Sequence, residues 1–174
     1  MDIRKAKIND APNWWKLVHT VKSEDLPTLF KMVKNITLES TNEYLTNILD
    51  SEGSFVLICI DNKTIIGSVD VIRKKRLEES HIADIGMCIL KEYRNKGIGT
   101  KLLEELFKNC KKERKIDKIE LDVFSNNISG MKLYEKMGFE YEGTRKGSIL
   151  KDGKKLDLFM MGKQLWLFLS LNIL

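Results

Sequence analysis

The stretch Arg94-Asn95-Lys96-Gly97-Ile98-Gly99-Thr100 lies between an apolar run typical of a strand and an amphipathic run typical of a helix. A strand, a glycine turn and a helix start bring several backbone N–H groups into one pocket, with the positive end of the helix dipole behind them. Gly97 and Gly99 have no Cβ, so an anionic group can come close to the main chain. The stretch therefore predicts a phosphate-binding turn.

Two common phosphate-binding motifs do not fit this turn. The residues from Gly97 to Lys101 lack both the first glycine and the Gly-Lys-Ser/Thr ending of a P-loop. A dinucleotide fingerprint would need a third glycine near position 102, where Leu102 stands. The pattern that fits is R-x-x-G-x-G. It resembles the pyrophosphate loop, Q/R-x-x-G-x-G/A, of the GNAT superfamily of acyl-CoA-dependent N-acetyltransferases.

A second block strengthens this resemblance. The residues from Asn126 to Phe139, NNISGMKLYEKMGF, resemble the N-x-x-A-x-x-L-Y-x-x-x-G-F signature of the same superfamily. The Asn of the signature falls on Asn127 and its Tyr on Tyr134, whereas the usual Ala falls on Gly130. Glycine is a poorer helix former than alanine, but the exchange removes no chemical group. With the flanking strands, the resemblance covers roughly residues 3–163.

The apolar periodicity along the chain predicts an α/β fold. Strands are expected at 3–8, 55–60, 65–72, 82–90, 119–123, 139–144 and 155–162. Helical segments are expected after Asp10, at 26–33, at 44–49 with Thr41 or Asn42 as the cap, after Gly97, and at 127–137. The order β-α-α-β-β-β-α-β-α-β-β predicts a mixed sheet of six to seven strands flanked by helices, which is the order of the GNAT fold.

Length and composition agree with one domain. The chain has 174 residues, 43% of them hydrophobic and 32% charged, and only two prolines, so it can bury a full core. Residues 1–164 are expected to form a single acetyltransferase domain. The apolar tail at 165–174 is too short to span a bilayer, and we expect it to pack on the domain or on a partner subunit, as in a homodimer.

The remaining composition bears on compartment and partners. Cys59, Cys88 and Cys110 are spaced neither like a zinc site nor like a disulfide framework, and the N-terminus has no apolar signal region, so a cytoplasmic location is expected. Basic residues alternate with acidic ones, so the net charge of +5 predicts neither a nucleic-acid nor a membrane partner. Two isolated histidines predict no metal site.

The resemblance implies acetyl-CoA as cosubstrate. The backbone of Met87, Cys88 and Ile89 would pair with the pantetheine arm like an extra strand, provided that the strand beginning at Ile119 splays away. Asn127 would bond the pantetheine or another polar edge of the cofactor. The pyrophosphate would bind to Arg94, Asn95, Lys96, Gly97, Ile98, Gly99 and Thr100. For Arg94, a role in holding the loop at the surface is the alternative to phosphate contact.

The resemblance also implies catalytic roles. Tyr134 is predicted to be the general acid, because a phenol with a pKa near 10 can protonate the leaving thiolate. Asp84, just before the cofactor strand, is the favoured general base. His81, Glu120, Asp122 and a water relay stay open as alternatives.

The predicted reaction is direct attack on acetyl-CoA, in a ternary complex, by the primary amine of a small molecule or of a peptide or protein N-terminus. Amino acids, polyamines and drug-like amines stay open as acceptors, and the helical segments between residues 10 and 50 are expected to shape the acceptor site. A non-catalytic acyl-CoA-binding regulatory module would bind the cofactor without turnover. A nucleic-acid-binding protein would show salt-dependent affinity for duplexes and no affinity for coenzyme A.

Overall fold

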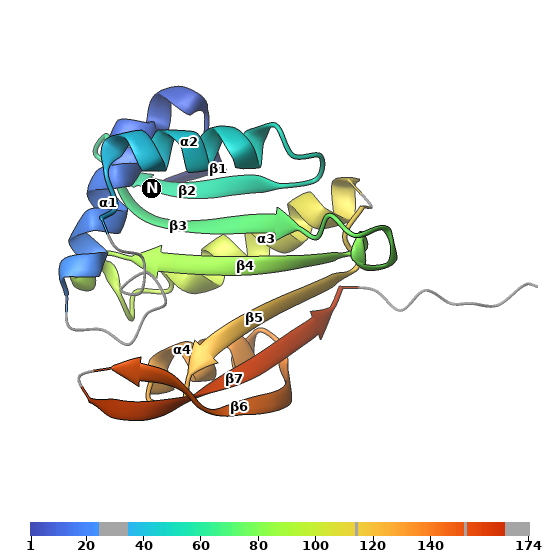
Figure 1. Cartoon of the computed structure of the whole chain (residues 1–174). Helices are drawn as coiled ribbons and strands as arrows, with labels where there is room; N and C mark the ends of the chain where they lie inside the picture. The colour runs from blue at the N-terminus through green and yellow to red at the C-terminus, as the bar shows by residue number, and fades with distance from the viewer. Residues whose placement is uncertain (25–34, 114, 152, 166–174) are drawn as a thin grey trace, which may run out of the picture.

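A computed structural model describes residues 1–24, 35–113, 115–151 and 153–165. The strands form one seven-stranded mixed sheet in the order β1-β2-β3-β4-β5-β7-β6 (Figure 1). The expected α/β fold and its mixed sheet are confirmed. The main elements are β1 (Asp2–Lys5), α1 (Ala11–Ser23), α2 (Leu38–Leu49), β2 (Phe55–Asp61), β3 (Thr64–Arg73), β4 (Ile82–Ile89), α3 (Ile98–Glu113), β5 (Lys118–Phe124), α4 (Ile128–Lys136), β6 (Glu140–Lys151) and β7 (Lys154–Gln164).

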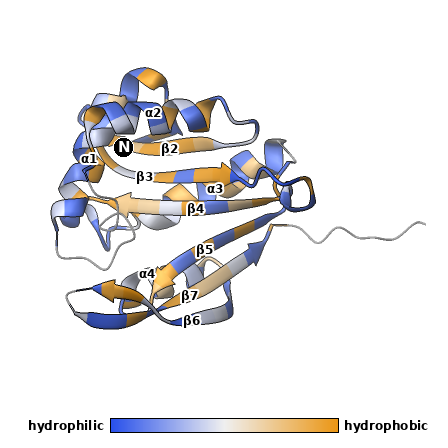
Figure 2. Ribbon diagram, viewed as in Figure 1, coloured by the Kyte–Doolittle hydropathy of each residue, from blue (hydrophilic) through white to orange (hydrophobic). Residues whose placement is uncertain are grey.

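Helices cover both faces of the sheet. The pair α1 and α2 lies on one face, and α3 and α4 lie on the other (Figure 1). Because successive side chains of a strand point to opposite faces, β2 serves both layers. Val56 and Ile58 pack under α1 and α2, whereas Phe55, Leu57 and Cys59 belong to the core under α3. Figure 2 shows the resulting apolar residues along the central strands.

Several predicted boundaries were wrong for local reasons. The first strand ends at Lys5, because Asp10 binds Arg4 at 2.7 Å and accepts the Lys7 N–H at 2.8 Å, which folds residues 8–10 into a 3-10 turn. Helix α2 begins earlier than expected, because Thr37, not Thr41 or Asn42, is its N-cap. The Thr37 hydroxyl accepts the Ser40 N–H at 3.0 Å.

The C-terminal hairpin also differs from its prediction. Strand β6 runs on to Lys151, beyond the predicted end at residue 144, and two register shifts near Tyr141 and Arg145 interrupt its pairing with β7. Such bulges disturb the alternation of polar and apolar residues from which a strand is recognised. The predicted helix at 26–33 lies outside the described residues, as does the tail from residue 166 on. Leu165 packs on the core and donates its N–H to the Asp117 carbonyl at 2.8 Å.

The sheet opens between β4 and β5. The two strands pair in parallel at three positions, the last of which joins Asp84 to Glu120. Beyond Asp84 they diverge, while β4 stays paired with β3 and β5 stays paired with β7 along their lengths (Figure 1). In the described part of the chain, no strand pairs with the second half of β4 on this side. The splay that the cofactor prediction requires is therefore present.

Candidate active site

A cavity of about 410 Å³ lies where β4 and β5 diverge. It is lined by the end of β4, the turn before α3 and one side of α4. Apart from Lys96, all the residues predicted to contact the cofactor line it, and Lys132 and Lys136 of α4 add positive charge. A larger cavity of about 630 Å³ lies between the end of α2 and the β3–β4 connection, and no predicted cofactor or catalytic residue lines it. The cavity at the splay is therefore the candidate active site.

The turn before α3 presents backbone donors to this cavity. Asn95 and Gly97 both have positive φ, 57° and 80°, and no atom lies within 4 Å of the place where a Cβ on Gly97 would stand. The first amide of α3 to bond inside the helix is that of Lys101, which donates to the Gly97 carbonyl at 3.1 Å. The three preceding N–H groups have no partner within the helix, and they carry the positive end of its dipole. This arrangement suits a phosphate.

Gly99 lines the cavity and also has a packing role. A Cβ at this position would lie 2.6 Å from Cδ2 of Leu133 on α4. The glycine therefore allows α3 to pack closely on α4.

Arg94 holds the loop. Its Nε and Nη2 donate to the Ile89 carbonyl at 2.8 and 2.6 Å, and Nη2 lies 2.6 Å from Oε2 of Glu24 at the end of α1. Glu24 Oε2 is buried and makes no hydrogen bond of regular geometry to the described residues, so the contact is an ion pair. Of the two roles considered for Arg94, this geometry supports the holding role.

The free edge of β4 offers fewer groups than predicted. Lys74 donates its N–H to the Ile82 carbonyl, and Leu90 donates to Ile66. Because backbone groups of an antiparallel strand alternate between its two sides, the even-numbered residues of β4 face β3 and the odd-numbered ones face the opening. The backbone of Met87 and the N–H of Ile89 are thus available, whereas the backbone of Cys88 is turned toward β3.

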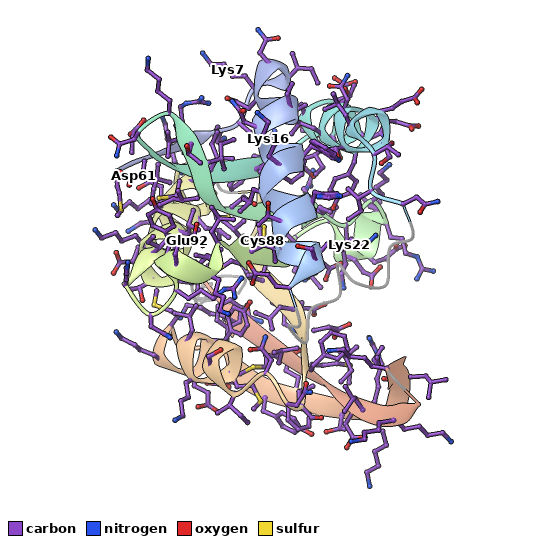
Figure 3. All side chains as sticks on the ribbon, turned by 90° about the vertical axis from the view of Figure 1, so that its left-hand side faces the viewer. Lys7, Lys16, Lys22, Asp61, Cys88 and Glu92 are labelled. Carbon is purple, nitrogen blue, oxygen red and sulfur yellow. The ribbon has the colours of Figure 1, made fainter. Side chains whose placement is uncertain are left out.

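The side chain of Cys88 lies under α1 (Figure 3). Its Sγ is 3.3 Å from the Ser68 hydroxyl, and burial raises the pKa of the thiol to about 12. Cys88 is therefore protonated at neutral pH and provides no thiolate that could take up an acetyl group.

Tyr134 projects from α4 into the cavity wall. Its ring packs edge-on against Phe139, with 5.6 Å between ring centroids. Burial, with a smaller contribution from the charge of Asp70, raises the pKa of Tyr134 to about 12. No described residue forms a hydrogen bond with its hydroxyl, so this proton is available to a ligand.

The comparison with known families decides what this geometry serves. Residues 17–139 match the family model described as "Acetyltransferase (GNAT) family". The chain belongs to the GNAT family. It is an N-acetyltransferase that transfers an acetyl group from acetyl-CoA to an amine.

Named relatives agree with this assignment. The chain is 30% identical over 138 residues to L-amino acid N-acetyltransferase AaaT of Escherichia coli, covering 79% of this chain and 85% of the relative. A solved GNAT acetyltransferase from Streptococcus pneumoniae is 28% identical, with a TM-score of 0.86 over 94% of this chain and 98% of that one. An acetyltransferase named yncA from Salmonella typhimurium, solved with acetyl-CoA, shares the fold at 18% identity and a TM-score of 0.84, covering 97% of this chain and 96% of that one.

Asn127 is the N-cap residue of α4 in this GNAT domain. Its side-chain oxygen accepts the Gly130 N–H at 3.0 Å and caps the helix. A Cβ at position 130 would lie 2.8 Å from the Asn127 amide nitrogen, so glycine in place of the usual alanine makes room for this cap. Asn127 also lines the cavity, and no described residue accepts a hydrogen bond from its amide nitrogen.

The predicted general bases do not line the cavity. Asp84 is 58% exposed, 3.9 Å from Lys74 Nζ, and burial raises its pKa although Lys74 opposes this. Burial alone would raise the pKa of Glu120, but hydrogen bonds from Lys118 and Lys74 outweigh it and lower the pKa. Asp122 pairs with Arg145 at 2.6 Å. His81, at the start of β4, is exposed.

Sequence reasoning missed a buried carboxylate. Asp70 is 6% exposed within β3, and the hydroxyl of Tyr44 on α2 donates to it at 3.1 Å. The available signal was an aspartate inside the apolar run from Ile65 to Ile72, where a charge is costly to bury.

The described residues contain no helix long and apolar enough to cross a membrane. They also contain no group of three or more His, Cys, Asp or Glu residues that could hold a metal ion.

Proposed function

We propose that this enzyme acetylates the primary amine of a small molecule, with L-amino acids as the first class to test. The observation that carries the proposal is the opening between β4 and β5, with the phosphate turn at one end and the Tyr134 hydroxyl in its wall. The name of the relative AaaT supports the choice of L-amino acids.

The site residues have distinct roles in this proposal. The backbone of Met87 and the N–H of Ile89 bind the pantetheine arm, and Asn127 donates to it. The N–H groups at the start of α3 hold the pyrophosphate, with Lys96, Lys132 and Lys136 adding positive charge nearby. Tyr134 is the general acid.

The reaction runs by direct attack in a ternary complex. The amine nitrogen forms a bond to the thioester carbon, and the C–S bond then breaks. Tyr134 protonates the departing thiolate and regains its proton from water. Asp84, favoured by the sequence as the base, is exposed and lies outside the cavity, so it can act only through water. An unchanged pH–rate profile in Asp84→Asn would remove it from the mechanism.

The test is titration calorimetry with acetyl-CoA, followed by an assay of thiol release with L-amino acids, spermine and a peptide with a free N-terminus. We expect acetyl-CoA to bind and L-amino acids to give the highest kcat/KM. Thiol release with the peptide alone would make the acceptor a protein N-terminus. Binding without thiol release from any amine would leave a regulatory acyl-CoA-binding module.

We infer that the enzyme works in a reducing cytosol and that its tail at 165–174 packs on a partner subunit in a homodimer. All three cysteines are buried, and the tail is almost entirely apolar. Light scattering on a chain that ends at Leu165 tests the dimer: a monomer of unchanged fold supports it, and a persistent dimer contradicts it.

A further inference from the structure

Asp70 is a buried carboxylate without a cation. Within the described ranges, no Lys, Arg or His lies within ion-pair distance of it, and Tyr44 is the only side chain that donates a hydrogen bond to it. A buried charge is normally paired, because the loss of hydration is otherwise uncompensated. The position of Asp70 therefore calls for a positively charged group that the described residues do not supply, and a bound ligand can provide it.

The carboxylate lies over β4 beside the opening. Asp70 is paired with Gly86, and a Cβ on Gly86 would stand 2.9 Å from Oδ1 of Asp70. Gly86 thus leaves room for the carboxylate on the face of β4 that α1 and α2 cover. This position falls between Asp84, where β4 and β5 stop pairing, and Met87, where the free edge offers its backbone. Gly86 is itself partly exposed, so the carboxylate lies under an open stretch of the strand.

Aromatic side chains from both covering helices hold this arrangement. Trp14 of α1 stacks on Tyr44, with 6.0 Å between ring centroids and 17° between ring planes. The Trp14 indole N–H donates to the Ser68 hydroxyl at 2.9 Å. Ser68 is two residues before Asp70 on β3, so both side chains lie on the same face of the sheet. We call Trp14, Tyr44, Ser68 and Asp70 the acidic corner. Of these four residues, Tyr44 is 40% exposed and the other three are buried, so the corner meets the surface at Tyr44.

The acidic corner adjoins the cavity at β4, because the Ser68 hydroxyl lies 3.3 Å from Sγ of Cys88, a residue that lines the cavity. The charge of Asp70 contributes to the raised pKa values of both Tyr134 and Cys88. The titratable groups around Asp70 are Tyr44 on α2, Cys88 on β4 and Tyr134 on α4. The pKa of each is raised, chiefly by burial, so all three are protonated at neutral pH and none supplies a positive charge.

We propose that Asp70 binds the ammonium group of the acceptor and accepts its first proton, with Tyr44 as the residue that positions the carboxylate. The inference rests on the proposed acetyltransfer to a primary amine. It assigns the acceptor to amines that are cationic at neutral pH and that enter from the α1–α2 face, opposite the α3–α4 face.

In this reaction, the ammonium nitrogen loses two protons and the thiolate takes up one. The ammonium group gives one proton to Asp70, which passes it to water, and the neutral amine attacks the thioester carbon. The nitrogen loses a second proton to water as the C–S bond breaks, and Tyr134 protonates the thiolate and is reprotonated from water. One proton is released overall for each acetyl group transferred.

The test is Asp70→Asn, which keeps the size of the side chain and its bond to Tyr44. With an L-amino acid acceptor, we expect kcat/KM to fall about 10²-fold and the acidic limb of its pH profile to disappear, while the Kd for acetyl-CoA is unchanged. An arylamine, which is already neutral at pH 7, should lose far less. Tyr44→Phe keeps the ring on Trp14 and should lower kcat/KM about 10-fold.

Asp61→Asn is the matched control, because Asp61 also accepts a tyrosine hydroxyl, that of Tyr93, at 3.3 Å. An Asp70→Asn enzyme with the same KM and pH profile as wild type would overturn the inference and leave the acetyltransferase intact. Equal losses with the ammonium and arylamine acceptors would also overturn it. Acetyl-CoA binding by wild type without turnover of any primary amine would overturn the proposed function, and the role of Asp70 with it.

Discussion

The two faces of β4 are built in opposite ways. On the α3–α4 side, the cavity that we propose for acetyl-CoA is lined mostly by residues of two short blocks of sequence, 94–100 and 127–136. On the α1–α2 side, the acidic corner is made of side chains from three separate elements, with Trp14 and Ser68 in contact although 54 residues apart in the chain. A ligand common to a whole family can be held by a local motif, whereas a particular acceptor is selected by side chains that only folding brings together.

The largest difference between the faces should appear in catalysis. We expect Tyr134→Phe to lower kcat about 10²-fold, because the thiolate would leave without a proton donor, while acetyl-CoA still binds. Steady-state kinetics and calorimetry measure the two effects. Tyr141→Phe is the control, since Tyr141 is exposed on β6. An unchanged kcat in Tyr134→Phe would mean that water protonates the sulfur.

The burial of Asp70 in the acidic corner should change the pH dependence of the free energy of unfolding as well as the activity. Burial raises the pKa of Asp70 from 3.8 to about 6, so between these values the folded protein binds more protons than the unfolded chain. Its contribution to stability is complete below about pH 4 and is lost as the pH rises through about 6. We expect Asp70→Asn to be about 3 kcal/mol more stable than wild type at pH 8 and equal to it near pH 4.

Urea denaturation at the two pH values measures this difference. Asp61→Asn should show no such change between them. If Asp70→Asn has the same free energy of unfolding as wild type at pH 8, the carboxylate is not destabilised by its burial.

On the α3–α4 side, binding of acetyl-CoA should depend on the backbone conformation of the turn before α3. Gly97 and Gly153 both have positive φ, 80° and 74°, with open space around the Cβ position. Alanine at either position is expected to cost about 1 kcal/mol of strain. Only Gly97→Ala should raise the Kd for acetyl-CoA, by about 10-fold, because it displaces the donors of the turn. An equal change in Gly153→Ala would show that the effect is general instability.

The smallest expected effect concerns the link between the faces. Arg94 joins the end of α1 to the end of β4, so we expect Arg94→Gln to lower the free energy of unfolding by about 1 kcal/mol. The salt dependence of acetyl-CoA binding should stay unchanged, because the guanidinium is already engaged. Lys132→Gln, on the cavity wall, should reduce that dependence. A reduced salt dependence of acetyl-CoA binding in Arg94→Gln would mean that Arg94 contacts the phosphate.

Much of the fold could be predicted because its signals are short-range. Apolar periodicity marked the strands of the sheet, and residues of the glycine turn and of the 126–139 block line the same cavity. The errors arose where a neighbour outside the pattern decides the outcome. Thr37 became the cap of α2 through its bond to Ser40, and Gly99 is required by the approach of Leu133. Cys88 lies in the correct strand, but the pairing with β3 turns its backbone away from the opening.

By itself, the sequence determined the family, the cosubstrate and the order of the elements, because a glycine turn or a helical repeat involves residues within a few positions of one another. Only the tertiary structure decided that β4 and β5 part after Asp84 and that Asp70 is buried beside Gly86, with no cation among the described residues to pair with it. Burial and pairing depend on which distant segments meet, and a carboxylate in the chain has the same identity whether it ends in water or under two helices. Its charge can bind a ligand cation strongly only when packing has removed the water around it.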